Sequence, residues 1–160
     1  MSLNTADLCD EFSDTLQISE PIFSDFGGNI DFSGPITTIK TFEDNTLVRA
    51  AVETPGEGRV LVVDAGGSRR CAMFGDNLAD LAVKNGWAGV IMYGCIRDSK
   101  AIGEMSVGLK ALATHPLKSV KADYGTTDVE VTFGGVTYVP GDYVYADRDG
   151  IVVSKTPLSL

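Results

Sequence analysis

Two continuous apolar runs with a helical pattern between them constrain what this 160-residue chain can fold into. Val60–Val63 and Gly89–Tyr93 show no alternation with polar residues, which is typical of strands buried on both faces of a sheet. Residues 75–85 between them begin with Gly-Asp-Asn and then carry apolar side chains at helical spacing. Such a strand–helix–strand unit joins two parallel strands by a right-handed crossover. The pattern therefore predicts an α/β fold with a parallel pair of strands at its centre.

Shorter elements are predicted around this unit. Apolar residues at helical spacing predict a helix over Thr5–Ser13 with Thr5 as its cap, and a second helix capped by Asp44. Residues 99–105 predict a helical turn. Strand-like segments, separated in the last third by glycine-containing turns, fall at residues 35–42, 109–114, 129–133, 136–139, 142–146 and 151–154. We expect one mixed α/β domain over residues 1–160, with three or four helices around β-sheets.

Composition argues against several classes of protein. The chain has 13 Lys and Arg against 22 Asp and Glu, a formal net charge of −9, which disfavours direct binding to nucleic-acid phosphates. Its single His and three Cys form neither H-E-x-x-H nor C-x-x-C, so neither a His-rich zinc site nor a disulfide framework is expected. Reduced thiols favour a cytoplasmic location. No apolar stretch approaches the roughly 20 residues of a membrane span, and the acidic N-terminus does not resemble a signal peptide.

Polar residues gather at the carboxyl edge of the predicted parallel pair, where ligands of open α/β sheets bind. Asp64-Ala65-Gly66-Gly67 follows the first strand, Arg97-Asp98 follows the second, and the helix between them begins at Gly75-Asp76. A helix N-terminus offers unpaired N–H groups to an anion, and Arg97 can hold the same anion with two hydrogen bonds. Asp98 offers hard oxygen ligands to Mg²⁺ or Mn²⁺. Together these features suit a small anionic substrate bound with a divalent metal.

Each of these residues also has a more common structural role. From the pattern alone, structural roles are about twice as frequent as functional roles for such residues. Asp76 would then cap a helix, Arg97 would form a surface ion pair, and Asp98 would cap a turn. The only histidine, His115, follows a predicted strand, and we expect it to be structural or exposed. Cys95, next to the Arg-Asp pair, is expected to be a small buried residue.

One spacing and several short segments resemble a known family. Asp76, then twenty residues, then Arg97-Asp98 matches the D-x20-R-D pattern of the class II, metal-dependent 4-hydroxy-4-methyl-2-oxoglutarate aldolases. Further segments resemble homologues of the regulator of ribonuclease E activity A, and they lie at residues 8–10, 20–21, 26–28, 42–45, 60–67, 93–98, 133–136 and 145–147. The chain departs from several aldolases in one respect. They carry another acid soon after the Arg-Asp pair, whereas here the nearest is Glu104.

The resemblance implies a three-layer β/β/α swivelling-type domain that assembles as a homotrimer or a dimer of trimers, with sites near subunit boundaries. It implies catalytic roles for Asp76 and Arg97, and Asp98 as the ligand of a divalent cation, with Asp76 in the water shell of that cation. The substrate-binding residues that it implies are Gly75, Asp76, Asn77, Leu78 and Arg97.

The resemblance further implies a metal-dependent lyase that cleaves 4-hydroxy-4-methyl-2-oxoglutarate into two pyruvates by a retro-aldol reaction. Oxaloacetate decarboxylation is expected as a secondary activity, because it passes through the same pyruvate enolate. The alternative is a non-catalytic protein that binds and inhibits ribonuclease E, whose basic surface an acidic trimer could cover. Neither hypothesis involves direct nucleic-acid contact or a membrane.

Overall fold

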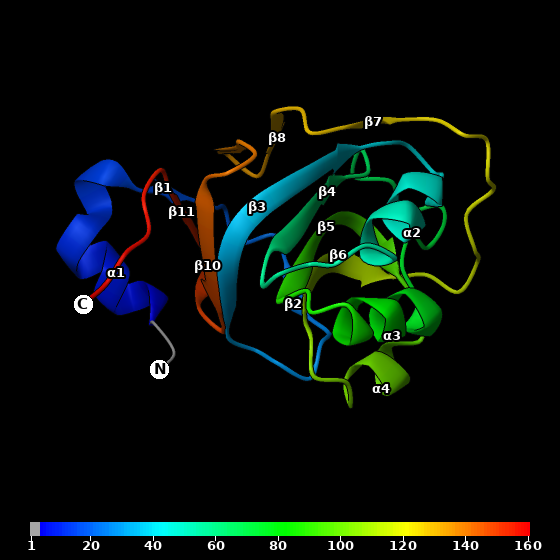
Figure 1. The fold of residues 1–160 in the computed structure, drawn as a ribbon, viewed down its shortest axis with the longest axis horizontal. Coiled ribbons are helices and arrows are strands. Elements are labelled where there is room, and N and C mark those ends of the chain that lie inside the picture. The colour runs from blue at the N-terminus through cyan, green and yellow to red at the C-terminus, as the bar shows by residue number, and fades with distance from the viewer. Residues whose placement is uncertain (1–3) are drawn as a thin grey trace.

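The computed structural model describes residues 4–160 of the chain, so it covers all but the first three residues of the predicted domain (Figure 1). The helices are α1 (Thr5–Phe12), α2 (Thr46–Val52), α3 (Asp76–Lys84) and α4 (Ser99–Ile102), with a 3₁₀ turn at Ser13–Thr15. The strands are β1 (Gln17–Ile18), β2 (Ser24–Asp25), β3 (Phe32–Lys40), β4 (Val60–Asp64), β5 (Gly89–Ile96), β6 (Gly108–Thr114), β7 (Thr126–Thr127), β8 (Val131–Phe133), β9 (Val136–Tyr138), β10 (Tyr143–Asp147) and β11 (Gly150–Ser154).

A mixed sheet with strand order β1-β11-β10-β3-β4-β5-β6-β2 forms the centre of the fold, and β8 and β9 form a separate hairpin. Strands β3, β4, β5 and β6 are parallel to one another. The predicted parallel pair is therefore confirmed as β4 and β5, and the helix between them as α3. All five residues of β4 are buried, as its uninterrupted apolar sequence predicted.

Strand β3 is shared between two layers of sheet. Its first residues, Phe32–Pro35, pair with β10, whereas Ile36–Lys40 pair with β4. In Figure 1 β3 curves from β10 and β11 across to the parallel strands. Helices α2, α3 and α4 cover the face of the parallel strands that is turned away from β10 and β11. The result is a β/β/α arrangement, which confirms the mixed α/β fold predicted from the sequence.

Alternating side chains of β4 separate two hydrophobic cores. Leu61 and Val63 pack with apolar residues of α2 and α3. Val60 and Val62 pack with residues of the β8–β9 hairpin and of β10. Because successive side chains of a strand point to opposite faces, one short apolar run contributes to both cores. This two-sided burial fixes the position of β4, and hence of the loops at its carboxyl end.

Two predicted helix caps differ from the structure. Asn4, not Thr5, caps α1 by accepting hydrogen bonds from the N–H groups of Ala6 and Asp7. Thr5 instead donates its N–H and its hydroxyl to the carboxylate of Asp147, at 2.7 and 2.6 Å. Helix α2 begins at Thr46, so Asp44 lies one residue before the cap position, although its Oδ1 still accepts the Thr46 N–H.

Several strand and helix boundaries also differ. Strand β3 begins at Phe32 rather than residue 35, because long-range pairing with β10 orders a Ser-Gly segment that has a turn-like composition. The two-residue strands β1, β2 and β7 were not predicted. The predicted turn over residues 99–105 is helical only as far as Ile102. None of the helices formed by residues 4–160 has the length and apolarity that crossing a bilayer requires.

Candidate active site

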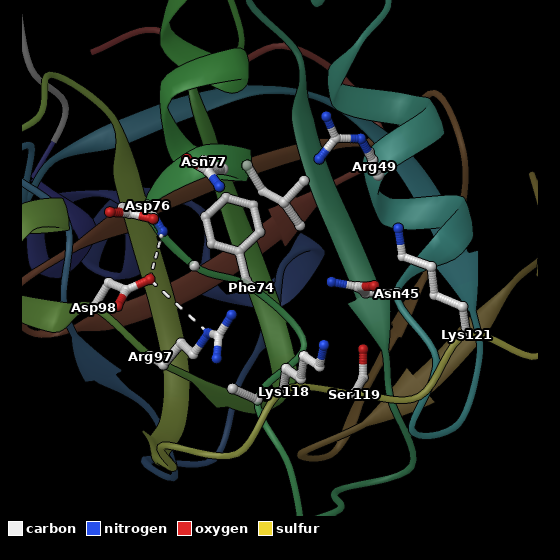
Figure 2. A pocket seen from close by; sticks show the side chains of 13 residues that line it. Asn45, Arg49, Phe74, Asp76, Asn77, Arg97, Asp98, Lys118, Ser119 and Lys121 are labelled. Atoms are coloured by element: carbon white, nitrogen blue, oxygen red, sulfur yellow. Dashed lines mark hydrogen bonds and ion pairs between the residues drawn. The ribbon is translucent and has the colours of Figure 1, made fainter.

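A pocket of about 240 Å³ opens at the carboxyl edge of the parallel strands (Figure 2). Four segments line it: the first turn of α2, the loop that leads into α3, the end of β5, and an irregular segment after β6. The lining residues are Asn45, Arg49, Ala72, Phe74, Gly75, Asp76, Asn77, Leu78, Arg97, Asp98, Lys118, Ser119 and Lys121. The structure therefore brings together Gly75, Asp76, Asn77, Leu78, Arg97 and Asp98, the residues to which the sequence assigned catalytic, substrate-binding or metal-binding roles.

The chain leaves β5 directly into the pocket. Arg97 donates its backbone N–H to the carbonyl of Phe74, which ties the end of β5 to the loop before α3. Asp98 then adopts a left-handed backbone conformation with φ 59°. Its Oδ2 accepts the backbone N–H of Asp76 at 3.1 Å and lies 4.0 Å from Nε of Arg97. Asp98 thus caps α3 across 22 residues of sequence, in addition to lining the pocket.

Gly75 makes that contact possible because it has no side chain. A Cβ atom at this position would lie 2.8 Å from Oδ2 of Asp98 and 3.5 Å from Cγ of Arg97. The backbone of Gly75 is extended, with φ −139° and ψ −169°, so space and not backbone conformation selects glycine here. Any larger residue would displace the carboxylate of Asp98.

The N-terminus of α3 faces the pocket with free hydrogen-bond donors. Among the residues that the structure describes, the N–H groups of Asn77 and Leu78 have no hydrogen-bond acceptor. Unpaired N–H groups and the helix dipole favour a carboxylate at this position. Figure 2 shows Arg97 and Asp98 beside this helix start, so an anion held there would lie within reach of both side chains.

The opposite wall of the pocket was not predicted from the sequence. Asn45 and Arg49 come from the start of α2, and Lys118, Ser119 and Lys121 come from the irregular segment after β6. Asn45 lies within one of the segments that resemble the family, at residues 42–45, which was the only available signal. The two lysines carry no periodic pattern and fall between predicted strands, so nothing local indicated their position.

A buried carboxylate joins the two segments of this opposite wall. Asp44 is 1% exposed, and its Oδ1 accepts the N–H and the hydroxyl of Thr46 at 2.9 and 2.6 Å. Its Oδ2 accepts the N–H groups of Ala122 and Tyr124 at 2.8 and 2.9 Å. Burial acts to raise the pKa of Asp44, but these hydrogen bonds outweigh it and hold the pKa well below its usual range.

The carboxylates of the pocket fit a hard divalent cation. Within residues 4–160, no three His, Cys, Asp or Glu side chains gather into a metal-binding cluster. Mg²⁺, however, keeps several waters and takes one or two protein carboxylates. The side chain of Asp98 contacts the Asp76 N–H and the Arg97 guanidinium through Oδ2, which leaves Oδ1 available to a cation. Asp76 adds a second carboxylate to the same pocket. The donor set therefore suits Mg²⁺ or Mn²⁺ bound with water and substrate.

Other residues near the strand ends lie outside the pocket. Asp64 accepts the N–H of Gly66 at 2.9 Å, and its loop does not line the pocket, although the sequence placed it at the same edge. His115 accepts the N–H of Leu117 through Nδ1 at 3.1 Å, which stabilises a turn. Cys95 is buried, with 1% exposure.

Comparisons with known proteins identify the family and the fold of the chain. A family model described as RraA-like, Aldolase/RraA, matches residues 5–153. A protein from Alkalilimnicola ehrlichii, with the provisional name 4-hydroxy-4-methyl-2-oxoglutarate aldolase, is 60% identical over 158 residues, which cover 99% of this chain and 98% of that protein.

Two crystal structures have the same fold. One, described as S-adenosylmethionine: 2-dimethylmenaquinone methyltransferase from Geobacillus kaustophilus HTA426, superimposes with a TM-score of 0.96 at 55% identity, covering 98% of this chain and 97% of the other. The other, described as the RNA-processing inhibitor RraA from Thermus thermophilis, superimposes with a TM-score of 0.95 at 42% identity, covering 99% and 96%.

Proposed function

Since this chain belongs to the RraA-like family, we propose that it is a lyase that cleaves 4-hydroxy-4-methyl-2-oxoglutarate into two molecules of pyruvate. The observation that carries the proposal is the meeting of Asp76, Arg97 and Asp98 at the N-terminus of α3. A protein that acted only by covering a partner would not need two carboxylates and an arginine inside a pocket. The aldolase name of a relative at 60% identity supports the same class of reaction.

The start of α3 is the proposed binding place for the 2-keto acid end of the substrate. The carboxylate of the substrate would accept hydrogen bonds from the free N–H groups of Asn77 and Leu78. Gly75, which has no side chain, leaves room for it. Arg97 would donate to the same carboxylate or to the keto oxygen beside it. Side chains on rigid secondary structure position a ligand more precisely than side chains on loops. Here the hydrogen bond between Arg97 and Phe74 ties the end of β5 to the start of α3.

The reaction breaks the bond between C3 and C4 of the substrate. The C4 hydroxyl loses its proton and becomes the keto group of one pyruvate, while the electron pair of the broken bond passes to the other fragment as an enolate. Arg97 places fixed positive charge where that negative charge develops. Asp76 is the group that we assign to the hydroxyl proton, directly or through a water molecule, and the proton returns to C3 of the enolate.

Asp98 is the proposed ligand of a divalent cation, Mg²⁺ or Mn²⁺, with Asp76 in its water shell. When bound, such a cation supplies Lewis-acid stabilisation of charge on the keto oxygen, an effect of several kcal/mol. Oxaloacetate decarboxylation is the proposed secondary activity, because loss of carbon dioxide produces the same pyruvate enolate and needs no base.

Methyl transfer, the activity for which the Geobacillus kaustophilus structure is named, fits this pocket less well. S-adenosylmethionine carries a positive sulfonium group, and the pocket presents four cationic side chains, Arg49, Arg97, Lys118 and Lys121. Pockets for ligands of that size also usually have roughly 300–1,000 Å³, against about 240 Å³ here. A small, multiply charged anion suits both the volume and the charge.

The second candidate function is inhibition of a ribonuclease by protein contact, without chemistry. The 42% identity to a protein described as an RNA-processing inhibitor favours it. The proposed assembly is a homotrimer or a dimer of trimers in the cytoplasm. Exposed apolar side chains beside the pocket, at Leu117, Val120 and Tyr124, would be covered by such an assembly or by a partner.

One assay tests the main proposal. Purified protein is mixed with 4-hydroxy-4-methyl-2-oxoglutarate or oxaloacetate, and pyruvate release is measured with Mg²⁺, with Mn²⁺ and with a chelator. We expect metal-dependent release, and its loss in Asp98→Ala but not in Lys100→Ala, a charged residue on α4 outside the pocket. Absence of metal-dependent turnover above background would refute the lyase, and inhibition of ribonuclease E by the same sample would then support the second function.

A further inference from the structure

Positive charge is concentrated in the pocket of an otherwise acidic chain. Four of the 13 Lys and Arg residues line it, together with only two carboxylates. The chain as a whole carries a net charge of −9. A cleft lined by one sign of charge raises the local concentration of ligands of the opposite sign. The pocket therefore holds more cationic groups than one carboxylate needs.

The cationic groups lie at two separate places. Figure 2 shows Arg97 beside Asp98 and Asp76 on one wall, and Arg49, Asn45 and Lys121 on the opposite wall, with Phe74 between them. Under the proposed function, the 2-keto acid end of the substrate occupies the first wall. That assignment leaves Arg49 and Lys121 with no role in the reaction.

These two side chains are available to a ligand. Arg49 has a single ion pair, with Glu53 of the same helix, at 3.7 Å between Nε and Oε1, and both side chains are about half exposed. Exposed pairs of this kind contribute little, so they compete weakly with a ligand. Lys121 forms no salt bridge with any residue of the described range 4–160.

Asp44 joins the two backbone segments that carry these side chains. Its Oδ1 is bound to Thr46 at the start of the helix that carries Arg49, and its Oδ2 is bound to Ala122, next to Lys121. With four hydrogen bonds, the carboxylate of Asp44 is saturated and does not itself present an acceptor to the pocket. Because the two segments are already joined, a ligand has to order only the side chains of Arg49 and Lys121, which lowers the entropic cost of binding.

From these contacts we infer that Arg49 and Lys121 form a second anion-binding subsite, which receives a second carboxylate of the substrate. The subsite would select 2-keto acids with two carboxylates over otherwise similar monocarboxylic acids. This inference rests on the proposed function, because that function places the first carboxylate at α3. Asn45, which lines the same wall, adds an uncharged donor to it.

The test compares two unreactive ligands of the same length. 2-Oxoglutarate and 2-oxopentanoate differ by a second carboxylate, and neither has the hydroxyl group that cleavage requires. Their affinities for the Mg²⁺-loaded protein are measured by titration calorimetry. We expect 2-oxoglutarate to bind about tenfold more tightly than 2-oxopentanoate, the lower range for a charge-assisted hydrogen bond at an exposed site.

The variants are Arg49→Gln, Lys121→Gln and the double substitution, with Lys100→Gln as the matched control outside the pocket. The double variant should lose the preference for 2-oxoglutarate and keep its affinity for 2-oxopentanoate within about twofold. Because both side chains are exposed, thermal unfolding should be unchanged. Equal affinities in the wild type, or a preference that survives in the double variant, would overturn the subsite.

Failure of the two proposals can be told apart. Suppose that the wild type cleaves no aldol substrate but prefers 2-oxoglutarate, and that the double variant has lost this preference. The lyase is then refuted and the subsite stands. If the wild type is active but binds both ligands equally, the subsite is refuted and the lyase stands. In an active enzyme, the double variant should raise KM for 4-hydroxy-4-methyl-2-oxoglutarate and leave KM for 4-hydroxy-2-oxopentanoate unchanged.

Discussion

The two walls of the pocket are built in different ways. The wall formed by Gly75–Leu78, Arg97 and Asp98 consists of the end of a central strand and the start of the helix that packs on it. The wall formed by Arg49 and Lys121 joins a short helix to a segment without regular structure, and the carboxylate of Asp44 holds the two together. The first is positioned by the fold as a whole, the second by a few hydrogen bonds to the Asp44 carboxylate and from the Thr41 hydroxyl to the carbonyls of Asp44 and Tyr124. The first should therefore tolerate damage elsewhere better than the second.

The largest expected effect comes from removing charge on the first wall. Arg97→Met should lower kcat/KM by at least about a hundredfold, because Arg97 is the cation that pairs with Asp98 at the start of α3. Steady-state kinetics with 4-hydroxy-4-methyl-2-oxoglutarate measure the loss, and circular dichroism checks the fold. Activity within tenfold of wild type would place the chemistry elsewhere.

A loss of space on the same wall should be nearly as severe. In Gly75→Ala the added methyl group lies 2.8 Å from Oδ2 of Asp98 in the present geometry, so the carboxylate must move away from α3. We expect kcat to fall by about tenfold to a hundredfold with little change in global stability. A crystal structure of the variant with Asp98 in its original position and normal turnover would contradict this reasoning.

On the second wall, the decisive residue is the buried carboxylate. In Asp44→Asn an NH₂ group replaces one carboxylate oxygen, so a donor faces the N–H groups that this oxygen accepts in the wild type. We expect the free energy of unfolding to drop by about 2 kcal/mol, measured by urea denaturation, and the preference for 2-oxoglutarate to weaken. A variant as stable as wild type would show that the four hydrogen bonds contribute little.

The same residue predicts a dependence on pH. The pKa of Asp44 is lowered by folding, so its contribution to stability is present above the ordinary value of 3.8 and is lost as pH falls below it. Urea denaturation at pH 6 and pH 3 should show that the wild type loses more stability than Asp44→Asn does over this interval. Equal losses in the two proteins would assign the acid sensitivity to other carboxylates.

The smallest effect should come from Lys118, the remaining cation that lines the pocket. Lys118 is exposed, and its charge is screened by salt, so Lys118→Gln should change KM by less than about threefold at physiological ionic strength. The effect should grow when salt is reduced. A tenfold change at high salt would indicate direct contact with the substrate and would blur the distinction between the two walls.

The difference between the walls also explains how much the sequence could predict. Val60–Val63 and Gly89–Tyr93 are recognised as uninterrupted apolar runs. The strands that they form bring Arg97 and Asp98 to the start of α3 by the geometry of one crossover. Lys118 and Lys121 reach the pocket only through long-range contacts, such as the hydrogen bond from Ala122 to Asp44, 78 positions away. Short-range patterns carry no information on such contacts.

Caps and strand starts show the same limit. Thr5 and Asn4 are both good capping residues, and the choice between them depends on Asp147, at the other end of the chain, which binds Thr5. Phe32–Gly34 form a strand because β10 lies beside them, although a Ser-Gly pair favours a turn. In both places tertiary contacts override a local preference.

Asp98 has a consequence for the evolution and engineering of this protein. With φ at 59°, it occupies a backbone region in which glycine is favoured over residues with a side chain. Replacement by glycine would relieve that conformational cost, but it would also remove the hydrogen bond that caps α3 and the carboxylate on which the proposed reaction depends. One side chain thus serves both the helix start and the proposed chemistry, so stability and activity at this position cannot be selected independently.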